Sequence, residues 1–255
     1  MLGTDFILDA LAAEGLDHLF MVPGGLVDPF LPALGRQSAI RPIVAAQEGG
    51  AAYMADGYAR ASGNFGAVLT IGGPGLGNTV TALQAARSDA SPVLLLSGEV
   101  ATAVEGLGMF QDASAQTLDD VEVVRPLVRY SSTIDSPRNL HHLFLRALLE
   151  MRAPPGAPVH LSVPQDAQLA SVAVRHARIP ASALGHGTIA LPAAQASLAL
   201  VAGADGAPPA KVAVLAGTGV AAGGGADALR RFAEAWDIPV ATTLRAKGVF
   251  PEDHP

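Results

Sequence analysis

The chain has 255 residues, of which 50% are hydrophobic and 15% are charged, and its formal net charge is −7. A chain of this length and hydrophobicity can bury a large core, so it is expected to form one large domain, or one domain and part of a second. The negative charge and the scattered Lys and Arg residues exclude an electrostatic footprint for nucleic acid or for a membrane surface. The absence of cysteine excludes disulfides and thiolate chemistry.

The first fifteen residues have no basic leader and carry acids within a helical pattern, which is not typical of a signal peptide. No run reaches about 18 uninterrupted apolar residues, so no transmembrane helix is expected. We therefore expect a soluble, cytoplasmic protein.

The first part of the chain alternates helical patterns with short apolar runs. The patterns predict helices over residues 4–14, 26–34, 47–61, 75–88 and 137–151, and strands over residues 18–22, 40–45, 67–71, 92–97 and 158–163. Strands that alternate with helices form parallel sheets covered on both faces. The prediction is thus an α/β fold with a parallel sheet flanked by helices on both faces.

Residues 171–190 lose this alternation, which is typical of a linker. Helices over 192–201 and 227–236 and strands over 211–216 and 238–242 then resume the pattern. These roughly 60 residues are short for an independent core. We therefore expect a domain at 1–170, a linker at 171–190, and an incomplete, Rossmann-like second α/β domain at 191–255.

Three glycine-containing segments each follow a predicted strand: residues 23–25, 47–50 and 72–75. In parallel sheets, ligands bind at the carboxyl ends of the strands, where glycines let the backbone come close and helix N-termini offer free N–H groups. The three segments are therefore expected to meet in one crevice.

Glu48 lies among small and apolar residues, between Ala45-Ala46 and Gly49-Gly50. If its carboxyl group is buried, loss of water favours the protonated form, which can share a proton with a ring nitrogen. The alternative is a solvated acid in the first turn of a helix, favoured by the helix dipole. The local sequence alone favours the second interpretation.

Several motifs resemble the thiamine diphosphate-dependent enzymes, and the acetolactate synthase branch in particular. The most specific is residues 48–60, EGGAAYMADGYAR, with Gly63 beyond it. Six further segments are similar to segments of the family and occur in the family's order: Val22-Pro23-Gly24-Gly25, Gly73-Pro74-Gly75 with Asn78, residues 92–98, Phe110-Gln111-Asp112, residues 156–166 and residues 246–255. The resemblance covers almost the whole chain.

The resemblance implies that residues 1–170 bind the pyrimidine end of thiamine diphosphate. It implies that Glu48 hydrogen-bonds the aminopyrimidine ring and so activates the cofactor, and that Gln111 acts at the reaction centre beside Phe110 in the substrate pocket. The remaining cofactor-binding residues implied are Pro23, Gly24, Gly25, Gly73, Pro74, Gly75 and Asn78.

Each of these residues also has a structural interpretation. In this interpretation, residues 23–25 only form a tight turn before a helix, and Asn78 is only a polar residue of a first helical turn. Gln111 bonds to backbone in its loop, and Phe110 belongs to the core. Both interpretations stay open for each of them.

Two family features are absent. The loop at residues 99–116 has no histidine, so it lacks the His-His pair of many decarboxylases in the family. The family's Gly-Asp-Gly motif with a later Asn, whose oxygens hold Mg²⁺ at the diphosphate, also has no counterpart, so no metal site is expected in this chain. Mg²⁺ is expected only through a diphosphate-binding domain downstream or on a separate subunit.

Flavin (FAD) use stays open, because Gly217-Thr218-Gly219 has Ala222 where the dinucleotide fingerprint needs a third glycine. The predicted function is the cofactor-activating part of an enzyme that makes or breaks C–C bonds next to a carbonyl, on 2-oxo acids, as a homo- or hetero-oligomer (dimer or tetramer). One alternative is an aldehyde or acyloin carboligase or lyase. Another is a non-catalytic fragment or supporting subunit.

Overall fold

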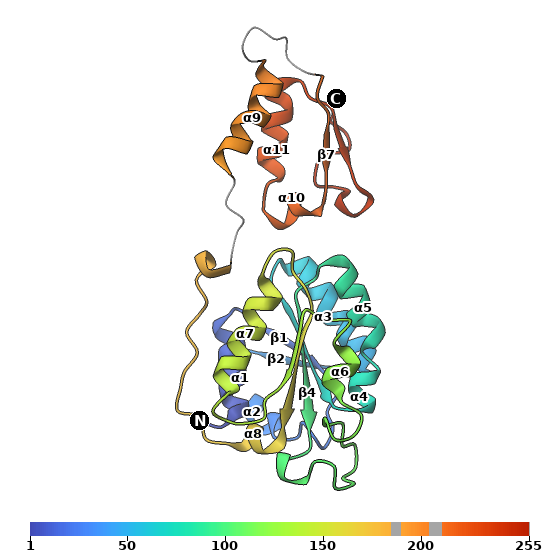
Figure 1. Ribbon diagram of the computed structural model, residues 1–255, viewed down its shortest axis with the longest axis vertical. Coiled ribbons are helices and arrows are strands. Elements are labelled where there is room, and N and C mark those ends of the chain that lie inside the picture. The colour runs from blue at the N-terminus through green and yellow to red at the C-terminus, as the bar shows by residue number, and fades with distance from the viewer. Residues whose placement is uncertain (185–189, 204–210, 255) are drawn as a thin grey trace. The chain divides into compact units, whose positions relative to one another are not determined.

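The computed structural model describes residues 1–184, 190–203 and 211–254 (Figure 1). The chain forms two compact units, Met1–His186 and Gly187–Pro255. Of the described residues of the expected linker, 171–184 lie in the first unit and 190 lies in the second. The division at 1–170, 171–190 and 191–255 stays a prediction.

The first unit is built on a six-stranded sheet in the order β2-β1-β3-β4-β6-β5. All neighbouring strands are parallel. The strands are β1 (His18–Met21), β2 (Arg41–Val44), β3 (Gly66–Ile71), β4 (Val93–Glu99), β5 (Tyr130–Thr133) and β6 (Val159–Pro164).

Helices cover both faces of this sheet, as Figure 1 shows. One face carries α1 (Gly3–Ala13), α2 (Phe30–Arg36), α7 (Leu140–Arg152) and α8 (Gln165–Leu169). The other carries α3 (Glu48–Ser62), α4 (Pro74–Gly77), α5 (Val80–Asp89) and α6 (Asp120–Val124). In β4, Leu94 and Leu96 enter the first core and Val93 and Leu95 the second, as strand alternation requires. The predicted α/β fold is confirmed.

Two differences from the predicted elements concern the site. The helix expected up to residue 88 is broken at Asn78 and Thr79 into α4 and α5. The edge strand β5 is missing from the prediction, because its sequence YSST is polar and only half-buried. Short 3₁₀ turns occur at Thr102–Val104 and Ala181–Leu184.

A buried histidine ties the last three strands of the sheet together. His160 on β6 is hydrogen-bonded through Nε2 to Ser97 Oγ of β4 at 2.8 Å and through Nδ1 to Ser131 Oγ of β5 at 2.9 Å. Burial lowers the pKa of His160 to about 3, so the ring is neutral at physiological pH. This Ser-His-Ser arrangement lies inside the sheet and is structural.

The second unit contains α9 (Leu191–Ala202), β7 (Val214–Ala216), α10 (Thr218–Ala222), α11 (Ala226–Trp236), β8 (Val240–Thr242) and a 3₁₀ turn at Leu244–Ala246. Its two strands are parallel, and a small core forms from Ala216, Ala246 and Val249. The predicted start of a second α/β unit is therefore present. Across the part of the chain described here, no helix is both long and apolar enough to cross a membrane.

Candidate functional site

The loops that follow β1, β2, β3 and β4 lie at one edge of the sheet, because all four strands are parallel. Backbone hydrogen bonds join neighbouring loops at this edge. The Val22 N–H donates to the Leu69 carbonyl at 3.2 Å, and the Gly72 N–H donates to the Gly98 carbonyl at 2.7 Å. Figure 1 shows α2 and α4 leaving from this edge.

Glu48 is the first residue of α3, and its side chain is half-buried rather than enclosed. The Asn78 Nδ2 group donates a hydrogen bond of 2.9 Å to Glu48 Oε2. Gln47 caps the helix, because its Oε1 accepts from the Gly50 N–H at 3.0 Å. The carboxyl group thus stands at a helix N-terminus, where the dipole favours negative charge, with an amide donor fixing one oxygen.

Two glycines let the start of α3 come close to α4 and to Asn78, which directly follows it. A Cβ on Gly49 would lie 2.7 Å from the carbonyl oxygen of Asn78. A Cβ on Gly75 would lie 2.5 Å from Thr70 Oγ1 and 3.7 Å from Glu48 Oε1. The structure therefore brings Glu48, Gly75 and Asn78 together, although they come from different loops.

The loop at Pro23-Gly24-Gly25 lies beside the end of β3. A Cβ on Gly24 would be 2.7 Å from Ile71 Cγ2, whereas a Cβ on Gly25 would meet nothing within 4 Å. The Gly25 carbonyl accepts a hydrogen bond of 2.9 Å from Gln165 Nε2. Gly24 is thus fixed against the sheet, and Gly25 borders open space.

Phe110 and Gln111 lie in the loop between β4 and α6, residues 100–119. Phe110 is 83% exposed, so its interpretation as a core aromatic is wrong. Gln111 is half-buried and has a positive φ of 62°. Its carbonyl oxygen lies 3.8 Å from the position that a Cβ on Gly73 would take. The backbone of the 100–119 loop therefore reaches the glycine loop, residues 72–75.

Two buried acids beneath these loops are absent from the sequence prediction. Glu99, at the end of β4, is 1% exposed, and Asp120, at the start of α6, is 3% exposed. Burial raises the pKa of Glu99 to about 7 and that of Asp120 to about 6, because each charged form loses water. The sequence signal for Glu99 is its position three residues after the apolar run Leu94–Leu96, at the carboxyl end of the strand.

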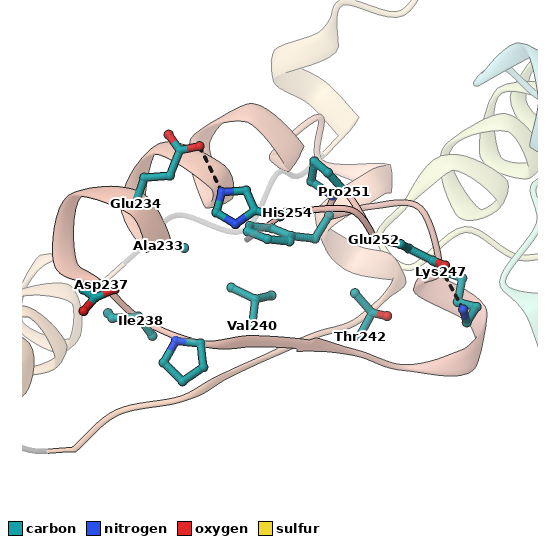
Figure 2. Close-up of a pocket in the computed structure, with 12 residues that line it drawn as sticks. Ala233, Glu234, Asp237, Ile238, Val240, Thr242, Lys247, Pro251, Glu252 and His254 are labelled. Atoms are coloured by element: carbon teal, nitrogen blue, oxygen red, sulfur yellow. Dashed lines mark hydrogen bonds and ion pairs between the residues drawn. The ribbon is translucent and has the colours of Figure 1, made fainter.

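No described set of three or more His, Asp or Glu side chains is arranged to hold a metal ion. A hollow of about 600 Å³ lies in the second unit (Figure 2). Val240 and Thr242 of β8 point into it, and a Glu234–His254 pair at 3.1 Å lies on its rim. All the site residues predicted from the sequence lie in the first unit, and we assign no ligand to this hollow.

Known families match both parts of the chain. The family described as thiamine pyrophosphate enzyme, N-terminal TPP binding domain, matches residues 1–122, and the central domain of these enzymes matches residues 207–255. The chain carries the N-terminal domain and part of the central domain of a thiamine pyrophosphate enzyme. The resemblance stated from the motifs is therefore confirmed.

The relatives of this thiamine pyrophosphate enzyme chain include acetolactate synthase large subunits. It is 36% identical over 266 residues to a probable acetolactate synthase large subunit of Methanocaldococcus jannaschii, an alignment that covers 100% of this chain and 42% of the relative. The subunits of Buchnera aphidicola and Lactococcus lactis are 30% and 29% identical, each over 99% of this chain and over 43% and 42% of their own length. The chain thus spans about two fifths of the length of these relatives.

The crowding at Gly75 is testable with a neighbour on the same helix. Gly75→Ala is expected to lower the free energy of unfolding by about 1–3 kcal/mol, because its Cβ would lie 2.5 Å from Thr70 Oγ1. Gly77→Ala adds a Cβ that meets nothing within 4 Å, so its effect should stay within about 0.5 kcal/mol. Urea unfolding followed by far-ultraviolet circular dichroism compares the two, and equal effects would contradict the packing described.

Proposed function

We propose that the first unit binds the aminopyrimidine end of thiamine diphosphate at Glu48 and activates the cofactor. The enzyme would make or break a C–C bond next to the carbonyl of a 2-oxo acid. The observation that carries the proposal is the carboxyl group of Glu48 at the start of α3, held at 2.9 Å by Asn78, which directly follows α4.

The described residues fit one end of a flat nitrogen heterocycle. Glu48 is half-buried, and its Oε1 faces Gly75, which has no side chain to obstruct it. A Cβ on Gly25 or on Gly50 would meet nothing within 4 Å, so both border open space. A carboxyl group that can give or take a proton, flanked by such positions, can hydrogen-bond a ring nitrogen.

When bound, thiamine diphosphate would supply a carbon nucleophile and an electron sink. Glu48 would hold or move a proton at Oε1, while Asn78 fixes Oε2. The amide of Gln111 would hydrogen-bond an oxygen of the substrate, and the exposed ring of Phe110 would cover its apolar part. Pro23, Gly24, Gly73 and Pro74 would border the cofactor through their backbone.

The diphosphate end and its Mg²⁺ would be held by a diphosphate-binding domain outside residues 1–255, downstream or on a separate subunit, in a dimer or larger oligomer. This proposal is supported by the sequence, which has no Asn after Gly206 to complete a Gly-Asp-Gly…Asn metal motif. No step of the chemistry above depends on the metal.

The test is reconstitution. The chain is mixed or fused with the part of the M. jannaschii relative that lies outside the alignment, and carboligation of pyruvate is measured against turnover of benzoin-type substrates. Acetolactate formation by the mixture, with none by the isolated chain, is the expected result. Preference for benzoin-type substrates would replace the 2-oxo acid by an aldehyde or acyloin. Steady turnover by the isolated chain would overturn the need for a second domain, and an inactive, cofactor-free mixture would favour a non-catalytic role.

A further inference from the structure

The carboxyl group of Glu99 is anchored on one side only. Its Oε1 accepts from the Val100 N–H at 2.8 Å and from the Ala113 N–H at 3.2 Å. Its Oε2 is buried and meets no hydrogen-bond partner among the residues described. A buried charged oxygen without a partner is costly, whereas a protonated one is not charged. Ala113 follows Gln111 by two residues, so Glu99 also anchors the 100–119 loop.

Asp120 holds the other loop of the site. Its Oδ2 accepts a hydrogen bond of 2.9 Å from the Gly73 N–H. Gly73 has a φ of +59°, a conformation that side chains disfavour and that this bond helps to fix. Gly73 leads directly into α4 and so to Asn78, whose amide reaches Glu48.

Glu99 and Asp120 lie close together at Gly72. A Cβ placed on Gly72 would lie 2.9 Å from Asp120 Oδ2 and 3.3 Å from Glu99 Oε2. The unpartnered oxygen of Glu99 is therefore on the side of Asp120. Two buried carboxylates this close repel each other, and a single proton removes the repulsion.

The proton belongs on Glu99 Oε2, because that oxygen is buried without a hydrogen-bond partner among the described residues, whereas Asp120 Oδ2 accepts the Gly73 N–H. We propose that Glu99 and Asp120 are positioning residues, a carboxyl pair with one proton that holds the glycine loop and the 100–119 loop in place around Glu48. The proposal rests on the function proposed above and adds a source of pH dependence at residues outside the proposed cofactor contacts.

The charged side chains that face the pair are also acidic. Asp112 faces Glu99, and Asp119 faces Asp120. Asp112 favours the protonated form of Glu99, and Asp119 favours that of Asp120. Burial is the larger cause, and the pKa is raised to about 7 for Glu99 and to about 6 for Asp120. As the pH rises through this range, the pair loses its proton and the two charges repel. The loops should then loosen, and cofactor binding should weaken.

The first test is infrared spectroscopy of the chain itself across pH. The wild type is expected to show a protonated-carboxyl carbonyl band that disappears with a midpoint near about pH 7, the pKa of Glu99. Glu99→Gln should remove the part of the band that titrates near about pH 7, since an amide with the same shape cannot titrate, and should leave only the part from Asp120, whose pKa is about 6. Asp120→Asn keeps an oxygen for Gly73 but removes the charge, so it should lower the midpoint. Glu122→Gln, an exposed acid on the same helix, should leave band and midpoint unchanged.

The second test measures thiamine diphosphate affinity in the reconstituted enzyme. Wild-type affinity should fall by about tenfold between about pH 6 and pH 8, the equivalent of one pKa unit, while Glu99→Gln keeps its affinity over that range. A missing band, or a midpoint that Asp120→Asn leaves unmoved, would overturn the pair. A parallel fall of affinity in wild type and Glu99→Gln would overturn its positioning role. If the band behaves as expected but neither the wild type nor any variant binds thiamine diphosphate, the proposed function fails. The one-proton pair of Glu99 and Asp120 then still stands.

Discussion

Glu48→Gln is expected to lower kcat of the reconstituted enzyme by about 100-fold to 10,000-fold, the contribution typical of a positioned acid–base group. Glutamine keeps the size of the side chain and an oxygen for Asn78 Nδ2, so the 2.9 Å hydrogen bond can survive. What it cannot do is take up a proton at the second oxygen. Steady-state rates with pyruvate, measured at saturating cofactor, give the comparison.

Stability separates loss of chemistry from loss of fold. Glu48 is half-buried at the start of α3, so glutamine loses only the interaction of a charge with the helix dipole, about 0.3–1 kcal/mol. The matched control is Glu122→Gln on α6, where an exposed acid pairs with Arg125, and its rates should equal those of the wild type. Full activity in Glu48→Gln would remove Glu48 from its proposed role.

The sequence predicts the sheet but not the contact that assembles the site. Apolar runs such as Leu94–Leu96 identify buried strands, because both faces of a parallel sheet are covered. The hydrogen bond between Asn78 and Glu48 joins residues 30 positions apart. It depends on the break between α4 and α5, which a continuous helical pattern conceals.

The burial of acids is equally hidden from the sequence. In the sequence Glu99 is a polar residue at the end of a strand, whereas in the structure it is buried, accepts the Ala113 N–H and lies near Asp120, two residues that follow an irregular loop. Conversely, Phe110 is aromatic yet 83% exposed. Local pattern predicts which elements form, whereas the loops that cover a sheet edge decide which of its polar groups lose water.

Glu14→Ala is expected to lower the free energy of unfolding of the first unit by about 3 kcal/mol, because it leaves the partly buried Arg152 guanidinium, the buried His176 ring and the buried Ile179 N–H without their partner. Glu14 directly follows α1 and is 1% exposed. Its Oε2 accepts from Arg152 Nη1 at 2.5 Å, and its Oε1 accepts from His176 Nε2 at 2.6 Å and from the Ile179 N–H at 2.7 Å. The single carboxyl group thus fastens residues 176–179 to α1 and α7.

The control for this cluster is Glu150→Ala. Glu150 lies on α7 and pairs with Arg146 at 3.9 Å near the surface, so its removal should cost less than about 1 kcal/mol. Urea unfolding of both variants measures the difference, and a Glu14→Ala cost no larger than that of Glu150→Ala would contradict the cluster.

The same contacts predict that a chain ending at residue 170 is less stable than one ending at residue 184, since only the longer chain keeps His176 and Ile179 on Glu14. The proposed domain boundary at residue 170 would then mark the end of the sheet's own elements rather than the end of the folded unit.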